Sequence, residues 1–306
     1  MAPRNHAGLE NGYRLTGTGG QIVTWVGLLF VLLFLCLLPF LIGHVTLPSL
    51  AKLSPSSLLF GLCAAGMTLT GFTPMLSALL VVGLFPGAGG VRPFLRQIKT
   101  WRVGIGWYAI ALLGPMVLLV VDTGVNILLG GTTPKQWLAF PSPTNPGPGG
   151  LIFLCVQLVL SFAEELGWRG FGLPRLQERH GALTASLLIG LIWGTYHLWI
   201  MPICPHCLRL TDVLVTQYLR LIATAVIYGW MYNSTKGSLF LVMLAHAGHN
   251  LWTNLLPGVG GSPVIVALSY VAVAVVVVLM TDPRTLTRVA NHMAPTSKSE
   301  ANPRQV

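Results

Sequence analysis

Residues 151–169 read LIFLCVQLVLSFAEELGWR, an apolar run that ends in two adjacent glutamates, Glu164 and Glu165, with Arg169 one helical turn further on. A run of this kind is typical of a membrane-spanning helix. An ionised side chain within a bilayer costs about 2.5 to 3.5 kcal/mol to insert, so intramembrane glutamates indicate a functional site. This stretch therefore predicts both a span and a place for chemistry.

The whole chain has the composition of a polytopic membrane protein. Of its 306 residues, 53% are hydrophobic and only 8% are charged, and the mean hydropathy is +0.71. These values exclude a soluble globular domain. The net charge is +10, but the basic residues lie between apolar runs, where they orient spans and face lipid headgroups. We therefore expect no nucleic-acid partner.

Eight apolar runs are long enough to cross a hydrocarbon layer of about 30 Å. The second run contains Pro74, which predicts a kink or an early end. We expect an all-α integral membrane protein, a bundle of about eight transmembrane helices. The runs lie near residues 21–43, 56–84, 103–121, 150–167, 181–201, 213–232, 238–256 and 263–281.

The basic residues also predict orientation and domain layout. Most of them fall on one side of the membrane if both termini are cytoplasmic, as the positive-inside rule requires. We expect a cytoplasmic tail over 1–20, one membrane domain over 21–281 with a motif-bearing core at 150–256, and a disordered cytoplasmic tail over 282–306. Such a protein is a multi-pass protein of the cell membrane.

Two basic features outside the core have simple interpretations. The segment from Arg92 to Arg102 precedes the third run on its cytoplasmic side, so we expect it to contact anionic lipid at the inner face. Arg220 lies near the outer end of the sixth run, and its long side chain can snorkel to the outer interface.

The two glutamates are predicted to differ in environment. Glu165 and Arg169 are four residues apart and share a helical face, so they form a pair. That pairing neutralises Glu165 and leaves Glu164, rotated by about 100° around the helix, free for proton transfer. The alternative is that both glutamates mark the solvated cytoplasmic end of the span.

Two later spans carry further polar side chains. Trp193 and His197 share a face of the fifth span, and His246 and Asn250 share a face of the seventh. These side chains could instead form hydrogen bonds that tie neighbouring helices together, at about 0.6 kcal/mol per bond. Occurring with the glutamates on three separate spans, they favour one shared polar cavity.

Two chemistries fit such a cavity. A carboxylate and a histidine can deprotonate water while a second histidine and an amide stabilise the developing oxyanion, which suits amide hydrolysis without a cofactor. Alternatively, His197, His246 and Glu164 could bind zinc with an open fourth position. His249 is then a spare ligand or a packing residue. The chain has no His-Glu-x-x-His motif, which weakens the zinc interpretation.

Three polar motifs thus follow one another on successive spans. In chain order they are Glu164-Glu165-x-x-x-Arg169, Trp193-x-x-x-His197 and His246-x-x-x-Asn250. Together they resemble the motifs of the CPBP family, the CAAX-processing and bacteriocin-processing intramembrane proteases, also called the ABI family. The resemblance covers roughly residues 150–256, and it departs from the family at Trp193, where phenylalanine is usual.

The resemblance implies peptide-bond hydrolysis, classically removal of the last three residues after a prenylated cysteine. The partner is then a peptide or prenylated protein in the bilayer. By similarity, Glu164 activates water with His197, and His246 and Asn250 form the oxyanion site. A metal-free mechanism is preferred, with zinc as the open alternative.

By the same resemblance, Glu165 and Arg169 support the motif helix. A shared site also requires matching depths. His197 lies about 24 Å along its helix from Gly181, so the fourth helix must continue to about Gln177 to place Glu164 at a similar height.

Two other functions use the same polar cluster. One is a non-enzymatic immunity or accessory protein, and the other is a proton-coupled transporter, although no inverted repeat is visible. Cys204 and Cys207 lie on the predicted outer side, where a disulfide or plain thiols are favoured over a redox pair or half of a zinc site.

Overall fold

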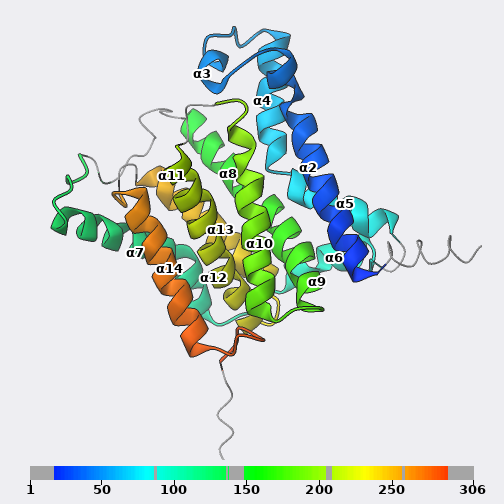
Figure 1. The fold of residues 1–306 in the computed structure, drawn as a ribbon, viewed down its shortest axis with the longest axis vertical. Coiled ribbons are helices and arrows are strands. Elements are labelled where there is room, and N and C mark those ends of the chain that lie inside the picture. Colours follow the sequence, from blue (N-terminus) through cyan, green and yellow to red (C-terminus); the bar gives the residue numbers. More distant parts are fainter. Residues whose placement is uncertain are drawn as a thin grey trace, which may run out of the picture.

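The computed structural model describes residues 17–85, 88–135, 137, 148–204, 209–256 and 259–288. Figure 1 shows long helices gathered side by side into one bundle. In the described part of the chain the one pairing of strand type is an isolated bridge between Asp282 and Thr287. The predicted all-α membrane fold is confirmed.

Helices occupy all eight predicted runs. Five are long and apolar enough to cross a membrane, or up to six if a bent pair counts as one span. The predicted number of eight and the orientation of the termini therefore stay predictions. The long segments are α2 (Thr18–Ile42), α4 (Leu58–Thr70) with α5 (Thr73–Leu84), α7 (Ile105–Leu128), α8 (Pro148–Glu165), α10 (Ala182–Tyr196), α12 (Arg220–Ser234), α13 (Leu239–Leu255) and α14 (Pro263–Met280).

Short helical segments connect or extend these helices. Two of them, η2 and η4, are π-helical turns that continue directly into or out of a longer helix. The short segments are α3 (Leu47–Leu50), α6 (Val91–Arg96), η1 (Gln97–Lys99), η2 (Leu166–Gly172), α9 (Leu173–Gln177), η3 (His197–Ile200), α11 (Leu210–Asp212) and η4 (Val213–Leu219).

Apolar side chains cover much of the outside of the bundle. Leu279 on α14 is 80% exposed and Val23 on α2 is 71% exposed, whereas soluble monomers expose few contiguous apolar patches. In a bilayer these side chains face hydrocarbon. The surface is that of a multi-pass membrane protein.

The second run is broken at Pro74, as predicted. Helices α4 and α5 meet at an angle of 66°, and Pro74 lies in the first turn of α5, where its missing N–H leaves no partner unsatisfied. The indole of Trp25 on α2 donates to the Pro74 carbonyl over 3.3 Å. A Cβ on Gly167 of η2 would lie only 2.5 Å from Pro74, so the break packs directly on the motif helix.

The C-terminal segment corrects one predicted boundary. The tail expected to be disordered from residue 282 is ordered over 282–288, and Leu286 is fully buried. The carbonyls of Arg284 and Pro283 accept from the backbone N–H groups of Ala182 and Leu183. These donors at the start of α10 have no partner within the helix, so the turn acts as their cap.

The packing of α2 on α4 gives the first prediction. A Cβ on Gly66 would lie 2.2 Å from the carbonyl oxygen of Cys36, whereas a Cβ on Gly61 of the same helix meets nothing within 4 Å. Gly66→Ala must therefore separate two backbones, and we expect it to lower the free energy of unfolding by about 1–3 kcal/mol. Unfolding in mixed detergent micelles measures the change.

The matched control is Gly61→Ala. Its free energy of unfolding should stay unchanged or rise by up to about 1 kcal/mol, because alanine favours helix over glycine. Equal stability of the two variants would contradict the close approach of α2 and α4.

Candidate functional site

The motif helix runs without interruption through the predicted site. Helix α8 continues into η2 and then α9, which ends at Gln177. The predicted extension to Gln177 is confirmed. Glu164 therefore lies about 20 Å along the helix from Gln177, and His197 lies about 24 Å along its own helix from Gly181. The two side chains are thus at similar heights. The π-helical turn begins immediately after Glu165, and π-helical insertions occur frequently at functional sites.

Glu165 lies at the centre of a buried ionic cluster. Its carboxylate accepts from Nη1 of Arg169 over 2.9 Å and 3.1 Å, and both side chains are fully buried. The same carboxylate lies 2.9 Å from Nδ1 of His246 on α13. The solvated alternative is thus wrong for Glu165, and the cluster joins the motif helix to α13.

The rest of the Arg169 guanidinium faces aromatic rings. Within the part of the chain that the structure describes, its buried Nε and Nη2 atoms have no hydrogen-bond partner. The carbon at the centre of the guanidinium lies 4.7 Å from the ring centre of Trp193 and 5.0 Å from that of Tyr228. Cation–π attraction of this kind is strongest when desolvated. Arg169 therefore also holds α10 and α12.

Glu164 has a different environment from its neighbour. It is half-buried, and its Oε2 atom accepts from the indole N–H groups of Trp168, over 3.3 Å, and Trp193, over 3.1 Å. Both donors are neutral, and within the described residues no donor reaches Oε1. The contribution of Trp168 was not predicted, although its spacing of four residues from Glu164 was visible in the sequence.

His197 lies at the point where α10 tightens into η3. Its Nδ1 atom is 2.9 Å from the backbone oxygen of Trp193. A carbonyl oxygen only accepts, so Nδ1 carries the hydrogen and the neutral ring has its lone pair on Nε2. The half-buried ring interacts electrostatically with Glu164. It is therefore suited to accept a proton near that carboxylate.

His246 is oriented by the ionic cluster. Its Nδ1–H donates to Glu165, so the neutral ring again presents the Nε2 lone pair. Because Nδ1 already carries a hydrogen, Nε2 becomes a donor only when the ring is protonated. Any role as an oxyanion donor therefore requires protonated His246.

Asn250 faces the motif helix from α13. Its Nδ2 atom donates to Oγ of Ser161 over 2.8 Å, and Ser161 in turn donates to the backbone oxygen of Gln157 over 2.7 Å. One hydrogen of the amide remains for another acceptor. Ser161 was not predicted, because a serine inside an apolar helix usually bonds its own backbone.

The indole of Trp193 lies between the predicted site residues. Its ring centre is 6.0 Å from that of His197 and 5.4 Å from that of His246, and its N–H reaches Glu164. Three spans thus bring these side chains to one place. The structure assigns Trp193 a polar contact that a phenylalanine could not make.

The zinc alternative concerns His197, His246 and Glu164. Among the described residues no three His, Cys, Asp or Glu side chains are grouped as metal ligands. Glu164 is bonded to indoles, His246 to Glu165, and His249 to Arg220 and Tyr270. The hydrogen bonds of His197 and His246 use only Nδ1, and those of Glu164 use only Oε2, so the zinc alternative stays open.

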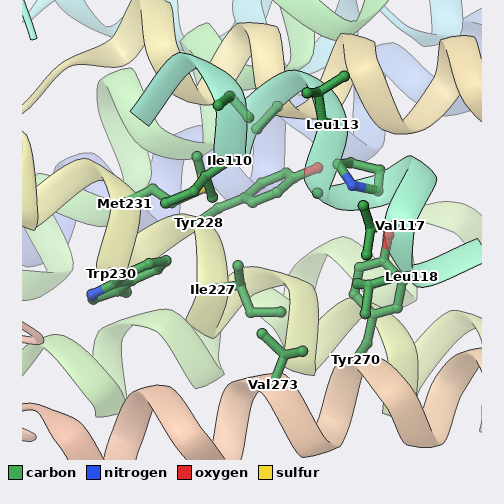
Figure 2. Close-up of a pocket in the computed structure, with 15 residues that line it drawn as sticks. Ile110, Leu113, Val117, Leu118, Ile227, Tyr228, Trp230, Met231, Tyr270 and Val273 are labelled. Atoms are coloured by element: carbon green, nitrogen blue, oxygen red, sulfur yellow. The ribbon is translucent and has the colours of Figure 1, made fainter. Parts of the chain in front are cut away.

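An apolar cavity of about 440 Å³ adjoins the polar site. Figure 2 shows Tyr228 and Tyr270 among the side chains that line it, with Ile110 and Val117 of α7 and Val273 of α14. The ring of Tyr228 lies 6.2 Å from that of His246. The cavity therefore places apolar surface next to the polar groups.

The two cysteines predicted to lie on the outer side are described only in part. Cys204 is disulfide-bonded, and Cys207 lies outside the described residues. The favoured disulfide interpretation agrees with the state of Cys204, and the role of Cys207 stays a prediction.

The motif-bearing helices match a known family. Residues 146–252 match the model of Rce1-like proteins, described as type II CAAX prenyl endopeptidase. That segment contains all three motifs and every residue of the polar site described above. The segment that carries the three motifs is therefore similar to the CPBP (CAAX protease) family.

The chain is also similar to CAAX prenyl protease 2 of Methanococcus maripaludis. The two are 29% identical over 111 residues, which cover 34% of this chain and 40% of that protein. The chain thus aligns with less than half of the length of the relative. The similarity concerns the motif-bearing helices.

The buried ionic cluster gives the second prediction. Glu165→Gln leaves Arg169 as a buried cation without its carboxylate, so we expect the free energy of unfolding to fall by about 3–5 kcal/mol. Arg169→Met in the Glu165→Gln background should recover part of the loss, because both charges are then absent. A double-mutant cycle in mixed micelles measures both effects.

Glu178→Gln is the matched control. Glu178 is exposed and bonded to Thr18, and such surface contacts contribute about 0–1 kcal/mol. Equal losses for Glu165→Gln and Glu178→Gln would contradict the buried cluster.

Proposed function

We propose that this protein is an intramembrane endopeptidase that hydrolyses a peptide bond of a membrane-associated, including prenylated, substrate. The observation that carries the proposal is the environment of Glu164. Two neutral indole N–H groups hold one oxygen of this carboxylate. Among the described residues nothing bonds the other oxygen or Nε2 of His197, and the two side chains interact electrostatically. Such a pair is suited to general-base activation of water.

In the proposed reaction, water lies between Oε1 of Glu164 and Nε2 of His197. One of these groups takes a proton while the water oxygen bonds to the carbonyl carbon of the substrate. The negative charge that develops on the carbonyl oxygen is stabilised by Nε2–H of protonated His246 and by the remaining N–H of Asn250. The C–N bond then breaks, and the captured proton passes to the leaving amine.

The proposal places the protein in the cell membrane with both termini cytoplasmic. The apolar cavity beside Tyr228 supports a substrate with a hydrocarbon chain, because apolar pockets of this size bury ligands of that kind. At the inner face, Arg92, Arg96 and Lys99 line a groove of about 1050 Å³. These three cations favour contact with anionic lipid.

We further propose that the reaction proceeds without a bound metal. The chain has no His-Glu-x-x-His motif, and general-base activation of water by Glu164 and His197 needs only groups that the chain itself supplies. No step of the proposed reaction uses a metal ion.

The third prediction tests the base. We expect Glu164→Gln and His197→Ala to reduce cleavage of a prenylated CAAX peptide by about 100-fold or more, because each removes a proton acceptor. The assay uses full-length protein in nanodiscs, with Glu178→Gln as the control that keeps activity. A parallel arm adds a zinc chelator, which should leave the rate unchanged.

A comparison of new protein termini in membranes expressing wild type or Glu164→Gln extends the test without assuming a substrate. Termini that appear only with wild type support proteolysis. Identical termini with folded protein would favour the binding or transport alternatives, and chelator-sensitive activity restored by zinc would overturn the metal-free mechanism.

The fourth prediction concerns the indole donors. Trp193→Phe keeps an aromatic ring but removes one N–H donor from Glu164, a bond to a charged group worth about 1.5–3 kcal/mol. We expect kcat to fall by about tenfold or more while KM changes little. Trp107→Phe on α7, which removes an indole that packs on Trp230, should leave kcat unchanged. Equal effects of the two substitutions on kcat would contradict the proposed role of the Trp193 indole N–H.

A further inference from the structure

Arg220 is a second charged side chain inside the bundle, and the proposed reaction does not use it. It begins α12 directly after the π-helical turn η4. Its Nη1 atom lies 3.2 Å from Nε2 of His249 on α13. The side chain therefore reaches inward to another helix, and the prediction that it snorkels to the outer interface is wrong.

The partners of Arg220 are neutral. Because a guanidinium only donates, Nε2 of His249 accepts and Nδ1 carries the hydrogen, which points at the Tyr270 hydroxyl 2.8 Å away. Among the described residues the ion pairs are those of Glu165 with Arg169 and His246. Asp122 on α7 is bonded to Ser269 instead. Arg220 has no carboxylate partner in that part of the chain.

A lone guanidinium within a membrane is costly and marks a site for an anion or another polar ligand. Arg220 and His249 are both half-buried rather than enclosed. The guanidinium has five donors, and its planar fork matches a carboxylate. The π-helical turn that ends at Arg220 independently points to a functional position.

Arg220 lies on the same stripe as the polar site. Arg220 and Tyr228 are eight residues apart on α12 and face α13, where they contact His249 and His246 respectively. His197 interacts electrostatically with both Glu164 and Arg220. His249 follows His246 by three residues on α13, a rise of about 4.5 Å, so the Arg220 guanidinium lies next to the level of the polar site.

We propose that Arg220, positioned by His249 and Tyr270, binds the free carboxylate at the C-terminus of the substrate peptide. This inference rests on the proposed function and adds a recognition site to it. The carboxylate supplies the negative charge that Arg220 lacks among the described residues, and the contact with His249 places that carboxylate on the same side of α13 as the polar site. The enzyme then selects peptides by their terminus as well as by their membrane anchor.

The test is binding to Glu164→Gln protein, which is expected not to turn over. Two prenylated peptides are compared, identical except for a free or an amidated C-terminus, in nanodiscs of phosphatidylcholine so that no anionic headgroup competes. We expect the free acid to bind about tenfold tighter than the amide. Adding Arg220→Met should reduce affinity for the acid to that for the amide and leave the amide unchanged.

Arg209→Met is the matched control, since Arg209 is an exposed arginine just before the same helical segment, and it should keep the preference for the acid. If Arg220→Met does not fold, Arg220→Lys is used instead, because it keeps the positive charge and loses the planar pair of N–H donors. The preference of this variant for the free acid over the amide should fall by at least about threefold.

Equal binding of acid and amide, or a preference that survives Arg220→Met, would overturn the carboxylate site. Failure of the protease proposal is distinguishable, since wild type would then cleave neither peptide whatever their affinities. Cleavage of both peptides with equal KM would support the protease proposal and contradict the proposed binding of the terminal carboxylate by Arg220.

Discussion

The buried pairing of Glu165 with Arg169 is the constraint on which the rest of the site depends. Two charges removed from water need one another and further polar partners, or the burial is too unfavourable. Here the carboxylate also accepts from His246, and the guanidinium lies against the rings of Trp193 and Tyr228. One ionic pair therefore determines how α8, α10, α12 and α13 sit around each other.

That pairing also explains why two adjacent glutamates have different environments. Successive residues on a helix point about 100° apart, so when Glu165 faces the cation, Glu164 must face the indoles of Trp168 and Trp193. The π-helical turn that follows places Trp168 and Arg169 beside the two carboxylates. Glu164 is thus held by neutral donors, whereas Glu165 is held by a cation.

Helices outside the matched segment support this arrangement from behind. The indole of Trp25 packs on Trp168 and Phe171, with ring centres 5.5 Å apart in each case, and donates to the Pro74 carbonyl. The broken α4 and α5 pair thereby fixes η2 from one side, while the ordered turn over 282–288 caps α10 from below. The polar groups are positioned because rigid helices surround them.

The sequence by itself determined the membrane class, the helical runs, the break at Pro74 and the pairing of Glu165 with Arg169. Each of these follows from run length, proline chemistry or a four-residue spacing within one helix. Only the tertiary structure decided that His246 binds Glu165, that Trp193 donates to Glu164, that Arg220 turns inward to His249 and that residues 282–288 are ordered. These contacts join different helices, and the rotation and depth of one helix against another arise from packing, which periodicity along one chain segment does not encode.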